Sequence, residues 1–339
     1  MKTFGLIGKA LSHSRSQQFF TEKFLQNGIT DAEYQLFSLT NIEEIKALLK
    51  HPTLLGFNVT IPYKSAIIPF LDETDAVSQT IGAVNCVVKE NGKWVGYNTD
   101  VVGFEKTICD MRDAICDMRD ERCEMRYAIC DMRYETIRNR ISQISNLKSQ
   151  IKISNLKSQI SNQNLKSQLS NLKSQISNLK SQIKISNLKS QISNQNIVLG
   201  SGGAAKAVCY ILKQKNIPFQ IVSRKKTEET ITYQELTEEL IHQSSLIINT
   251  TPLGMFPNRD EKPQIPYSAL HKDHILIDLI YNPEETLFLQ EGKKRGAVII
   301  NGLTMFEAQA EASYLRFKIK NLKLKSYAEF EIPHNAVIG

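Results

Sequence analysis

Cysteine is scarce in this sequence of 339 residues, and four of its six cysteines fall in one short repeat. Only Cys86 and Cys209 lie outside that repeat. A disulfide framework needs several cysteines that can pair in an oxidising compartment. The pattern therefore excludes the disulfide-rich class and favours a reducing cytoplasm.

Long apolar runs are missing as well. Residues 1–11 contain too short an apolar run for a signal peptide, and no stretch approaches the length of a membrane-spanning helix. Hydrophobic residues make up 41% of the chain and charged residues 23%, as in an ordinary globular protein. We therefore expect a protein outside the membrane that is long enough for two domains.

Most of the chain also lacks any excess of charge, although the whole carries a formal +7. Residues 109–194 hold 15 Lys and Arg against 8 Asp and Glu, which accounts for the entire net charge. Within that tract, residues 141–194 carry eight lysines and no acid. The remainder balances 27 residues of each sign, so it gives no reason to expect a nucleic-acid partner.

What the chain does have is a heptad repeat between its two halves. The first block repeats I-C-D-M-R-D-A and the second, within 141–196, repeats I-S-N-L-K-S-Q with two-residue slips. Apolar residues recur at the a and d positions of a coiled coil, but Ser and Asn are poor helix formers. The insertion 109–195 is accordingly a coiled-coil hairpin, a loosely helical or disordered segment, or a module that recruits a partner.

The repeated cysteines give no metal site. They recur every seven residues because the repeat unit does. Structural zinc sites usually pair cysteines about two to four residues apart. We therefore expect no bound metal.

The segments on either side of the repeat alternate strands with helices, which predicts an α/β protein with parallel strands and crossovers. Helices are expected at 16–27, 42–50 and 304–320, and Glu90-Asn91-Gly92-Lys93 is typical of a hairpin turn. The expected strands are 3–7, 34–38, 56–59, 86–88, 94–97, 197–199, 219–222, 246–248, 275–279 and 298–300.

A glycine-rich turn follows the strand at 197–199 and reads Gly200-Ser201-Gly202-Gly203-Ala204-Ala205. Glycines let the backbone approach a pyrophosphate, and the N-terminus of the next helix offers amide donors. The following strand ends at Val222, and Ser223-Arg224-Lys225-Lys226 comes next. These cations suit the 2′-phosphate of NADP, whereas an NAD site would place an acid there. The alternative is a solvated charged turn.

Three polar stretches in the first half stand where a core would not place them, namely 12–16, 58–64 and 96–100. Each has an ordinary structural interpretation when taken alone. Asp100 fits a helix N-cap, Lys64 a surface lysine, and His13 a structural hydrogen-bonding residue.

Taken together, the motifs resemble the shikimate dehydrogenase family, closely and in order. The matching stretches are 8–16, 58–64, 82–85, 98–100, 200–205, 249–255, 278–283 and 302–309. The resemblance covers 1–108 and 196–318. The chain departs from the family pattern at Ala10, Gln17, Tyr63 and Ser223, none of which is a reacting group.

The resemblance implies a catalytic domain of residues 1–108, completed by a helix at 303–320, and a Rossmann domain of residues 196–302. The insertion 109–195 would separate them, and the tail 321–339 has no motif that we can interpret. The family reduces 3-dehydroshikimate to shikimate with NADPH, on the route to chorismate and the aromatic amino acids.

The resemblance also implies the roles of individual residues. Lys64 would protonate the developing alkoxide and Asp100 would hold Lys64 in place. The substrate would contact, besides Asp100, residues Ser14, Ser16, Thr60, Asn85, Tyr281 and Gln309. NADP would contact Gly200, Ser201, Gly202, Gly203, Ala204, Ala205, Ser223, Arg224, Lys225, Thr250, Leu279 and Gly302.

The expected partner is this small-molecule substrate, bound by a monomer or homodimer with coiled-coil contacts through the repeat. Two alternatives stay open. One is a quinate/shikimate dehydrogenase that uses NAD. The other is a pseudoenzyme or scaffold whose repeat recruits a partner.

Overall fold

The computed structural model describes residues 1–11, 14–118, 174 and 196–317. The chain divides into two units, Met1–Cys109 with Asn196–Gly339, and Asp110–Gln195. Nearly all of the predicted insertion lies outside the described residues, and so do Ser12, His13 and the tail at 321–339. The architecture below is that of the first unit.

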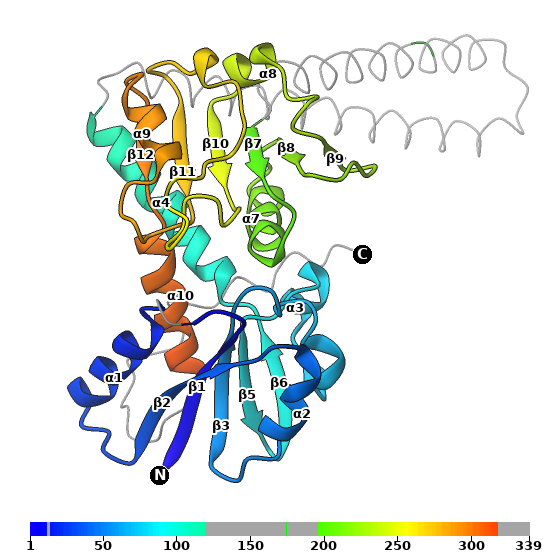
Figure 1. The fold of residues 1–339 in the computed structure, drawn as a ribbon, viewed down its shortest axis with the longest axis vertical. Helices are drawn as coiled ribbons and strands as arrows, with labels where there is room; N and C mark the ends of the chain where they lie inside the picture. The colour runs from blue at the N-terminus through cyan, green and yellow to red at the C-terminus, as the bar shows by residue number, and fades with distance from the viewer. Residues whose placement is uncertain (12–13, 119–173, 175–195, 318–339) are drawn as a thin grey trace, which may run out of the picture. The chain divides into compact units, whose positions relative to one another are not determined.

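The first half builds a six-stranded mixed sheet in the order β2-β1-β3-β5-β6-β4 (Figure 1). The strands are β1 (Lys2–Gly8), β2 (Ala32–Ser38), β3 (Leu54–Val59), β4 (Glu73–Thr74), β5 (Cys86–Glu90) and β6 (Lys93–Tyr97). Strand β1 is parallel to β2 and β3, whereas β5 is antiparallel to β3 and β6. Asn91 and Gly92 join β5 to β6 with φ of 51° and 83°, so the predicted hairpin turn is confirmed.

Among its described residues up to Tyr97, this half contains the helices α1 (Ser16–Gln26), α2 (Ile45–Leu48) and α3 (Ala76–Ile81). The single helix expected at 42–50 is wrong in its extent, because a 3-10 turn, Ile42–Glu44, precedes the short α2. Asn41 caps that turn through a capping box with Glu44. Pro52 disfavours helical backbone at the residue before it, which limits the helix at its other end.

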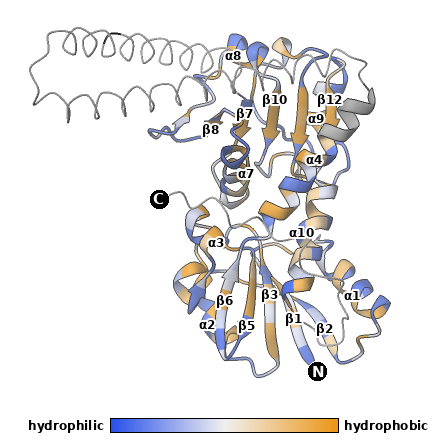
Figure 2. Ribbon diagram, turned by 180° about the vertical axis from the view of Figure 1, so that it is seen from behind, coloured by the Kyte–Doolittle hydropathy of each residue, from blue (hydrophilic) through white to orange (hydrophobic). Residues whose placement is uncertain are grey.

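The second half builds a wholly parallel six-stranded sheet in the order β12-β11-β10-β7-β8-β9. Its strands are β7 (Asn196–Leu199), β8 (Phe219–Val222), β9 (Thr230–Ile231), β10 (Leu246–Asn249), β11 (Ile275–Asp278) and β12 (Val298–Ile300). Helices α7 (Gly203–Gln214), α8 (Glu238–Gln243) and α9 (Leu287–Lys293) connect them. Strands β7, β10 and β12 are coloured hydrophobic in Figure 2, as expected for a parallel sheet covered on both faces.

Each sheet has its own core, and this confirms the predicted α/β fold. The first core includes Phe4, Phe20 and Tyr34, and the second includes Ile197, Ile247 and Phe288. Separate cores allow each half to form around its own buried surface.

Two long helices connect these parts of the chain. Helix α4 (Asp100–Met118) follows β6 and continues into the first repeat, so the predicted boundary at 108 falls within a helix. Helix α10 (Leu303–Arg316) follows the second sheet, yet its Tyr314 is buried in the first core. The helices lie side by side (Figure 1), and a Cβ added at Gly103 would lie 2.4 Å from the Met305 carbonyl oxygen. The expected helix at 304–320 ends at Arg316, before the undescribed residues begin.

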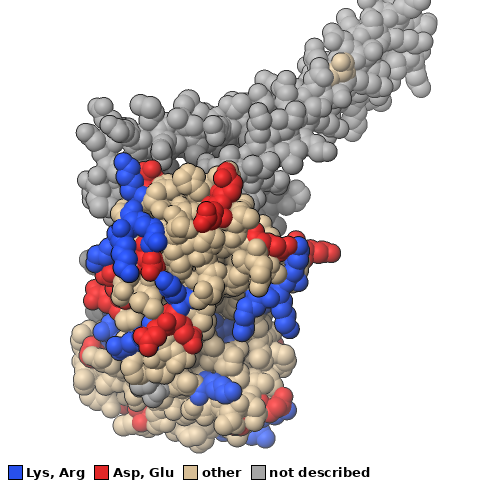
Figure 3. All heavy atoms as spheres, turned by 45° about the horizontal axis from the view of Figure 1, so that its top comes forward, with Lys and Arg blue, Asp and Glu red and all other residues tan. Residues whose placement is uncertain are grey.

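Charges of both signs are interspersed among the described residues on the face shown in Figure 3. Ion pairs occur among the described residues; for example, Lys262 and Arg295 both contact Glu291. Within the described ranges, no helix is long and apolar enough to cross a membrane.

Candidate active site

The centre of the site is an ion pair between Lys64 and Asp100. The Lys64 Nζ donates to Asp100 Oδ2 at 2.6 Å, and the two side chains are only 15% and 6% exposed. Lys64 lies in the turn after β3, where its carbonyl oxygen accepts a bond from the Val84 N–H at 2.7 Å. Asp100 is the first residue of α4, a position where the helix dipole stabilises a carboxylate.

Asn85 also forms a hydrogen bond with the Asp100 carboxylate. Its Nδ2 donates to Asp100 Oδ1 at 2.8 Å and lies 3.4 Å from Gln309 Oε1. The two oxygens of Asp100 thus have different partners, an ammonium and an amide. This arrangement fixes the orientation of the carboxylate and brings Lys64, Asn85, Asp100 and Gln309 together.

A buried polar layer that we did not predict lies behind these residues. Thr99 donates its backbone N–H to Asn85 Oδ1 at 2.6 Å, and its hydroxyl lies 2.9 Å from that of Ser313. Asn58 Nδ2 donates to the Ser313 hydroxyl at 2.8 Å, and the Tyr34 hydroxyl donates to Asn58 Oδ1 at 2.9 Å. Each of these groups has a partner, so the layer can hold Asn85 rigidly. The polar motifs containing Asn58 and Thr99 were the only signal for it in the sequence.

The other predicted substrate residues lie on three segments: Ser14 and Ser16 at the start of α1, Thr60 after β3, and Tyr281 after β11. The Ser14 hydroxyl accepts a bond from the Ser16 N–H at 3.2 Å at the start of α1. Burial raises the pKa of Tyr281, and a hydrogen bond to the Arg15 backbone opposes that shift. Tyr281 therefore reaches the loop that carries Ser14 and Ser16. Thr60 follows the last residue of β3.

The glycine-rich turn connects β7 to α7. Gly200 has φ of 110°, and a Cβ there would lie 2.5 Å from Thr250 Oγ1, so only glycine fits. Gly202 is the N-cap of α7, and a Cβ added there would have no neighbour within 4 Å. The next residue, Gly203, packs against Lys64, since a Cβ at Gly203 would lie 2.8 Å from Lys64 Cβ. The glycine-rich turn is thus in direct contact with Lys64, the candidate catalytic residue.

The polar loop after β8 lies beside this turn. The Ser223 hydroxyl is 3.1 Å from that of Ser201, and it accepts the Lys225 N–H at 3.4 Å. Arg224 and Lys225 are exposed. Lys226 instead forms an ion pair with Glu235, and its hydrogen bond lowers the pKa of that carboxyl to about 2. Arg224 and Lys225 are therefore the better placed of the three cations for an anionic ligand.

These residues fit a bound NADP. The open space at Gly202 and the amides at the start of α7 suit a diphosphate, and the exposed cations suit a 2′-phosphate. Leu279 and Gly302 are in contact, since a Cβ at Gly302 would lie 2.1 Å from the Leu279 carbonyl oxygen. Ala204 and Ala205 continue the first turn of α7. In the described part of the chain, no group of His, Cys, Asp and Glu could hold a metal ion.

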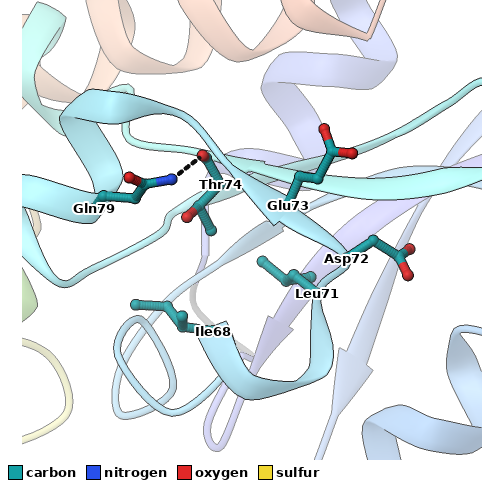
Figure 4. Close-up of a pocket in the computed structure, with 6 residues that line it drawn as sticks. All are labelled: Ile68, Leu71, Asp72, Glu73, Thr74 and Gln79. Atoms are coloured by element: carbon teal, nitrogen blue, oxygen red, sulfur yellow. Dashed lines mark hydrogen bonds between the residues drawn. The ribbon is translucent and has the colours of Figure 1, made fainter.

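A separate pocket of ≈ 430 Å³ contains none of the predicted residues. Ile68, Leu71, Asp72, Glu73, Thr74 and Gln79 line it (Figure 4). Its polar groups bond within the fold, because Asp72 accepts the Trp94 N–H at 2.7 Å and Glu73 pairs with Lys93 at 2.5 Å. We assign no ligand to it.

The fold and site together define a class, the two-domain nicotinamide-dependent oxidoreductases. A parallel dinucleotide-binding sheet and its glycine-rich turn lie against a shielded Lys–Asp pair from a second sheet. Comparison with known proteins then identifies the family.

Residues 6–87 match the model of the shikimate dehydrogenase substrate binding domain. Shikimate dehydrogenase (NADP(+)) of Methanococcus maripaludis is 30% identical over 329 residues, which cover 92% of this chain and 90% of the relative. That of Shouchella clausii is 31% identical over 326 residues, covering 92% and 91%.

Solved structures agree with this assignment. A shikimate dehydrogenase in complex with NADP+ has a TM-score of 0.59 at 27% identity and covers 94% of this chain and 90% of that one. Shikimate dehydrogenase 1 of Peptoclostridium difficile has a TM-score of 0.61 at 25% identity, covering 95% and 93%. The chain belongs to the shikimate dehydrogenase family.

Proposed function

We propose that this protein catalyses the reversible, NADPH-dependent reduction of 3-dehydroshikimate to shikimate, on the route to chorismate and the aromatic amino acids. The observation that carries the proposal is the shielded Lys64–Asp100 pair in contact with the first residue of α7. A proton donor thereby lies next to the place where a nicotinamide cofactor would bind. Family membership supplies the substrate.

Lys64 is the proton donor. Bound NADPH supplies the hydride to the C3 carbonyl carbon. The carbonyl oxygen then gains negative charge, which the Lys64 ammonium stabilises and protonates. In the oxidation of shikimate, Lys64 takes the same proton back. Asp100 keeps the Lys64 side chain oriented through their 2.6 Å hydrogen bond.

The remaining groups bind the substrate. The hydroxyls of Ser14 and Ser16 hold its carboxylate, and Thr60, Asn85 and Asp100 bond its ring hydroxyls. Gln309 reaches the ring from α10, next to Asn85, and Tyr281 lines the site beside the Arg15 backbone. Because most of these groups are already hydrogen-bonded within the fold, the site is organised before the substrate arrives.

We assign substrate binding to residues 1–108 with α10, and NADP binding to residues 196–302. The turn from Gly200 to Ala205 would hold the diphosphate, and Ser223, Arg224 and Lys225 the 2′-phosphate. Thr250, Leu279 and Gly302 would line the path to the nicotinamide. A cytoplasmic location and a monomer or homodimer are part of the same proposal.

One assay tests the function. Purified protein is given shikimate or quinate with NADP or NAD, and reduced nicotinamide is followed by its absorbance. We expect turnover of shikimate with NADP, and a loss of about 10²- to 10⁴-fold in kcat for Lys64→Ala. Lys50→Ala, which alters an exposed lysine, is the control. A preference for NAD or activity on quinate alone would favour the NAD-dependent alternative. A folded wild-type protein without turnover would favour a scaffold role.

A further inference from the structure

Lys206 forms hydrogen bonds between the domain of the second sheet and the domain of the first. Neither the proposed chemistry nor the predicted site uses this residue. It lies in the first turn of α7, and its Nζ donates to the Gly82 carbonyl oxygen at 3.1 Å and to the Ser65 hydroxyl at 3.2 Å. Both acceptors belong to the first half of the chain. A cation in the first turn of a helix is disfavoured by the helix dipole, so a compensating interaction is expected for it.

The acceptors are parts of the scaffold that holds Lys64. Ser65 is the next residue along the chain, and its hydroxyl donates to the same Gly82 carbonyl oxygen at 2.8 Å. Gly82 ends α3 with φ of 66°, and the Val84 N–H donates to the Lys64 carbonyl oxygen at 2.7 Å. The turn that carries Lys64 and the end of α3 therefore form one hydrogen-bonded unit.

The same helix turn also contacts the Lys64 side chain itself. Gly203 packs against the Lys64 side chain, and Lys206 follows three residues later in the same turn of α7. Any separation of the two domains at this point breaks the Lys206 bonds and the Gly203 contact together. The start of α7 is also where the cofactor diphosphate would bind, so ligand binding and domain contact involve the same helix turn.

We propose that Lys206 is a positioning residue that couples the binding of cofactor to the binding of substrate. It stabilises the arrangement in which the α7 N-terminus lies against the Lys64 turn, and each ligand then favours the arrangement that the other needs. This inference rests on the proposed function. Lys206 itself contacts neither ligand and transfers no proton.

The test measures coupling in a complex that cannot react. NADPH and shikimate are both reduced, so their ternary complex does not turn over. The Kd of shikimate is measured by calorimetry with and without saturating NADPH, for wild type and Lys206→Met. The coupling is the Kd of shikimate without NADPH divided by its Kd with saturating NADPH. We expect this ratio to be about 3- to 10-fold lower in Lys206→Met than in wild type, as for the loss of an exposed charge-assisted hydrogen bond. The affinities for each ligand alone should stay within about twofold.

Three further variants make the result specific. Lys213→Met removes an exposed lysine from the same helix and should leave the coupling unchanged. Lys206→Arg keeps the donors and should restore part of the coupling. Ser65→Ala removes one shared acceptor and should reduce the coupling less than Lys206→Met. In the double variant Lys206→Met/Ser65→Ala, the two losses of coupling should not add, because both substitutions act on one hydrogen-bonded group.

Several outcomes would overturn the proposal. An unchanged ratio in Lys206→Met, or a wild-type ratio near one, would show that Lys206 couples nothing. If Lys206→Met weakens NADPH binding alone by the same factor as ternary binding, Lys206 is a diphosphate ligand instead. A wild-type protein that binds neither NADPH nor shikimate would overturn the proposed function itself, and this inference with it.

Discussion

At the scale of single residues, two buried aspartates show how their partners decide the role of a carboxylate. Asp100 faces the Lys64 ammonium at 2.6 Å, so its negative charge has a close counterion. Asp278, at the end of β11, accepts its described bonds from neutral donors: Asn249 Nδ2, the Ile280 N–H and the Thr286 hydroxyl. Burial raises the pKa of Asp278 to about 6 despite these bonds. The first aspartate suits catalysis, whereas the second joins β10, β11 and α9.

Because the pKa of Asp278 is raised, we predict that the free energy of unfolding depends on pH. A folded-state pKa of about 6 against 3.8 in the unfolded chain means that the folded state binds more protons between these values. Its contribution is fully present below about pH 4 and is lost as pH rises through about 6. In Asp278→Asn, which keeps the shape, this loss is absent. The free energy of unfolding of wild type should fall relative to the variant by on the order of 3 kcal/mol over that window.

Chemical denaturation at pH 4.5, 5.5, 6.5 and 7.5 measures this difference. Asp260→Asn, at an exposed site, is the control and should show no such trend. A constant difference between wild type and Asp278→Asn across the series would contradict the raised pKa of Asp278.

We predict that Arg224 determines the preference for NADP over NAD. It is exposed beside Ser223 and is free to meet a 2′-phosphate, whereas Lys226 is already paired with Glu235. We expect Arg224→Ala to lower the ratio of kcat/KM with NADP to that with NAD by about 10- to 100-fold, since a charge-assisted bond is lost. Lys226→Ala should change this ratio far less. Equal effects of the two substitutions would show that both cations contact the cofactor.

At the scale of elements, periodicity predicts the long strands and helices well. The buried strands of both sheets occur where alternation and apolar runs indicate them, within about two residues at each end. The missed strands are β4 and β9, which have two residues each and are too short to show a period. The fold class was therefore accessible from the sequence, whereas one edge strand of each sheet, β4 or β9, was not.

The site was predictable only in part, for a physical reason. Motifs place Lys64 and Asp100 at the end of a strand and the start of a helix, but spacing alone cannot show that they touch. Asn58 bonds to Ser313 across 255 positions of sequence. Such pairs depend on how α10 returns to the first core, which no local pattern contains. The resemblance to a family supplied the roles that local chemistry left open.

The crossing of α4 and α10 gives a prediction about packing. Alanine is a better helix former than glycine by about 1 kcal/mol, so propensity alone would make Gly103→Ala stabilising. However, the added Cβ would lie 2.4 Å from the Met305 carbonyl oxygen, so the helices must separate. We expect a net loss of about 1–3 kcal/mol in the free energy of unfolding. Chemical denaturation of Gly103→Ala beside wild type measures this difference. A more stable Gly103→Ala would contradict the close crossing.

At the scale of the whole molecule, the question is what the heptad repeat adds. Both cores and every residue of the proposed site lie in the unit made of Met1–Cys109 and Asn196 onward. The repeat holds the whole net charge of +7. Its first residues are nevertheless part of α4, and Met111 on that helix is buried at 7% exposure. A useful deletion must therefore spare α4.

Replacing residues 119–195 with a Gly/Ser linker of about 12 residues meets this condition. The deletion removes 14 Lys and Arg with 5 Asp and Glu, which turns the net charge from +7 to −2. We expect kcat/KM for shikimate and NADP to stay within about threefold, because the cores and the Lys64–Asp100 pair are retained. Light scattering and ion-exchange retention, measured beside the full chain, report mass and charge. A folded deletion variant that lost turnover would show that the repeat acts on the site, and a halved mass would show that it joins two copies of the chain.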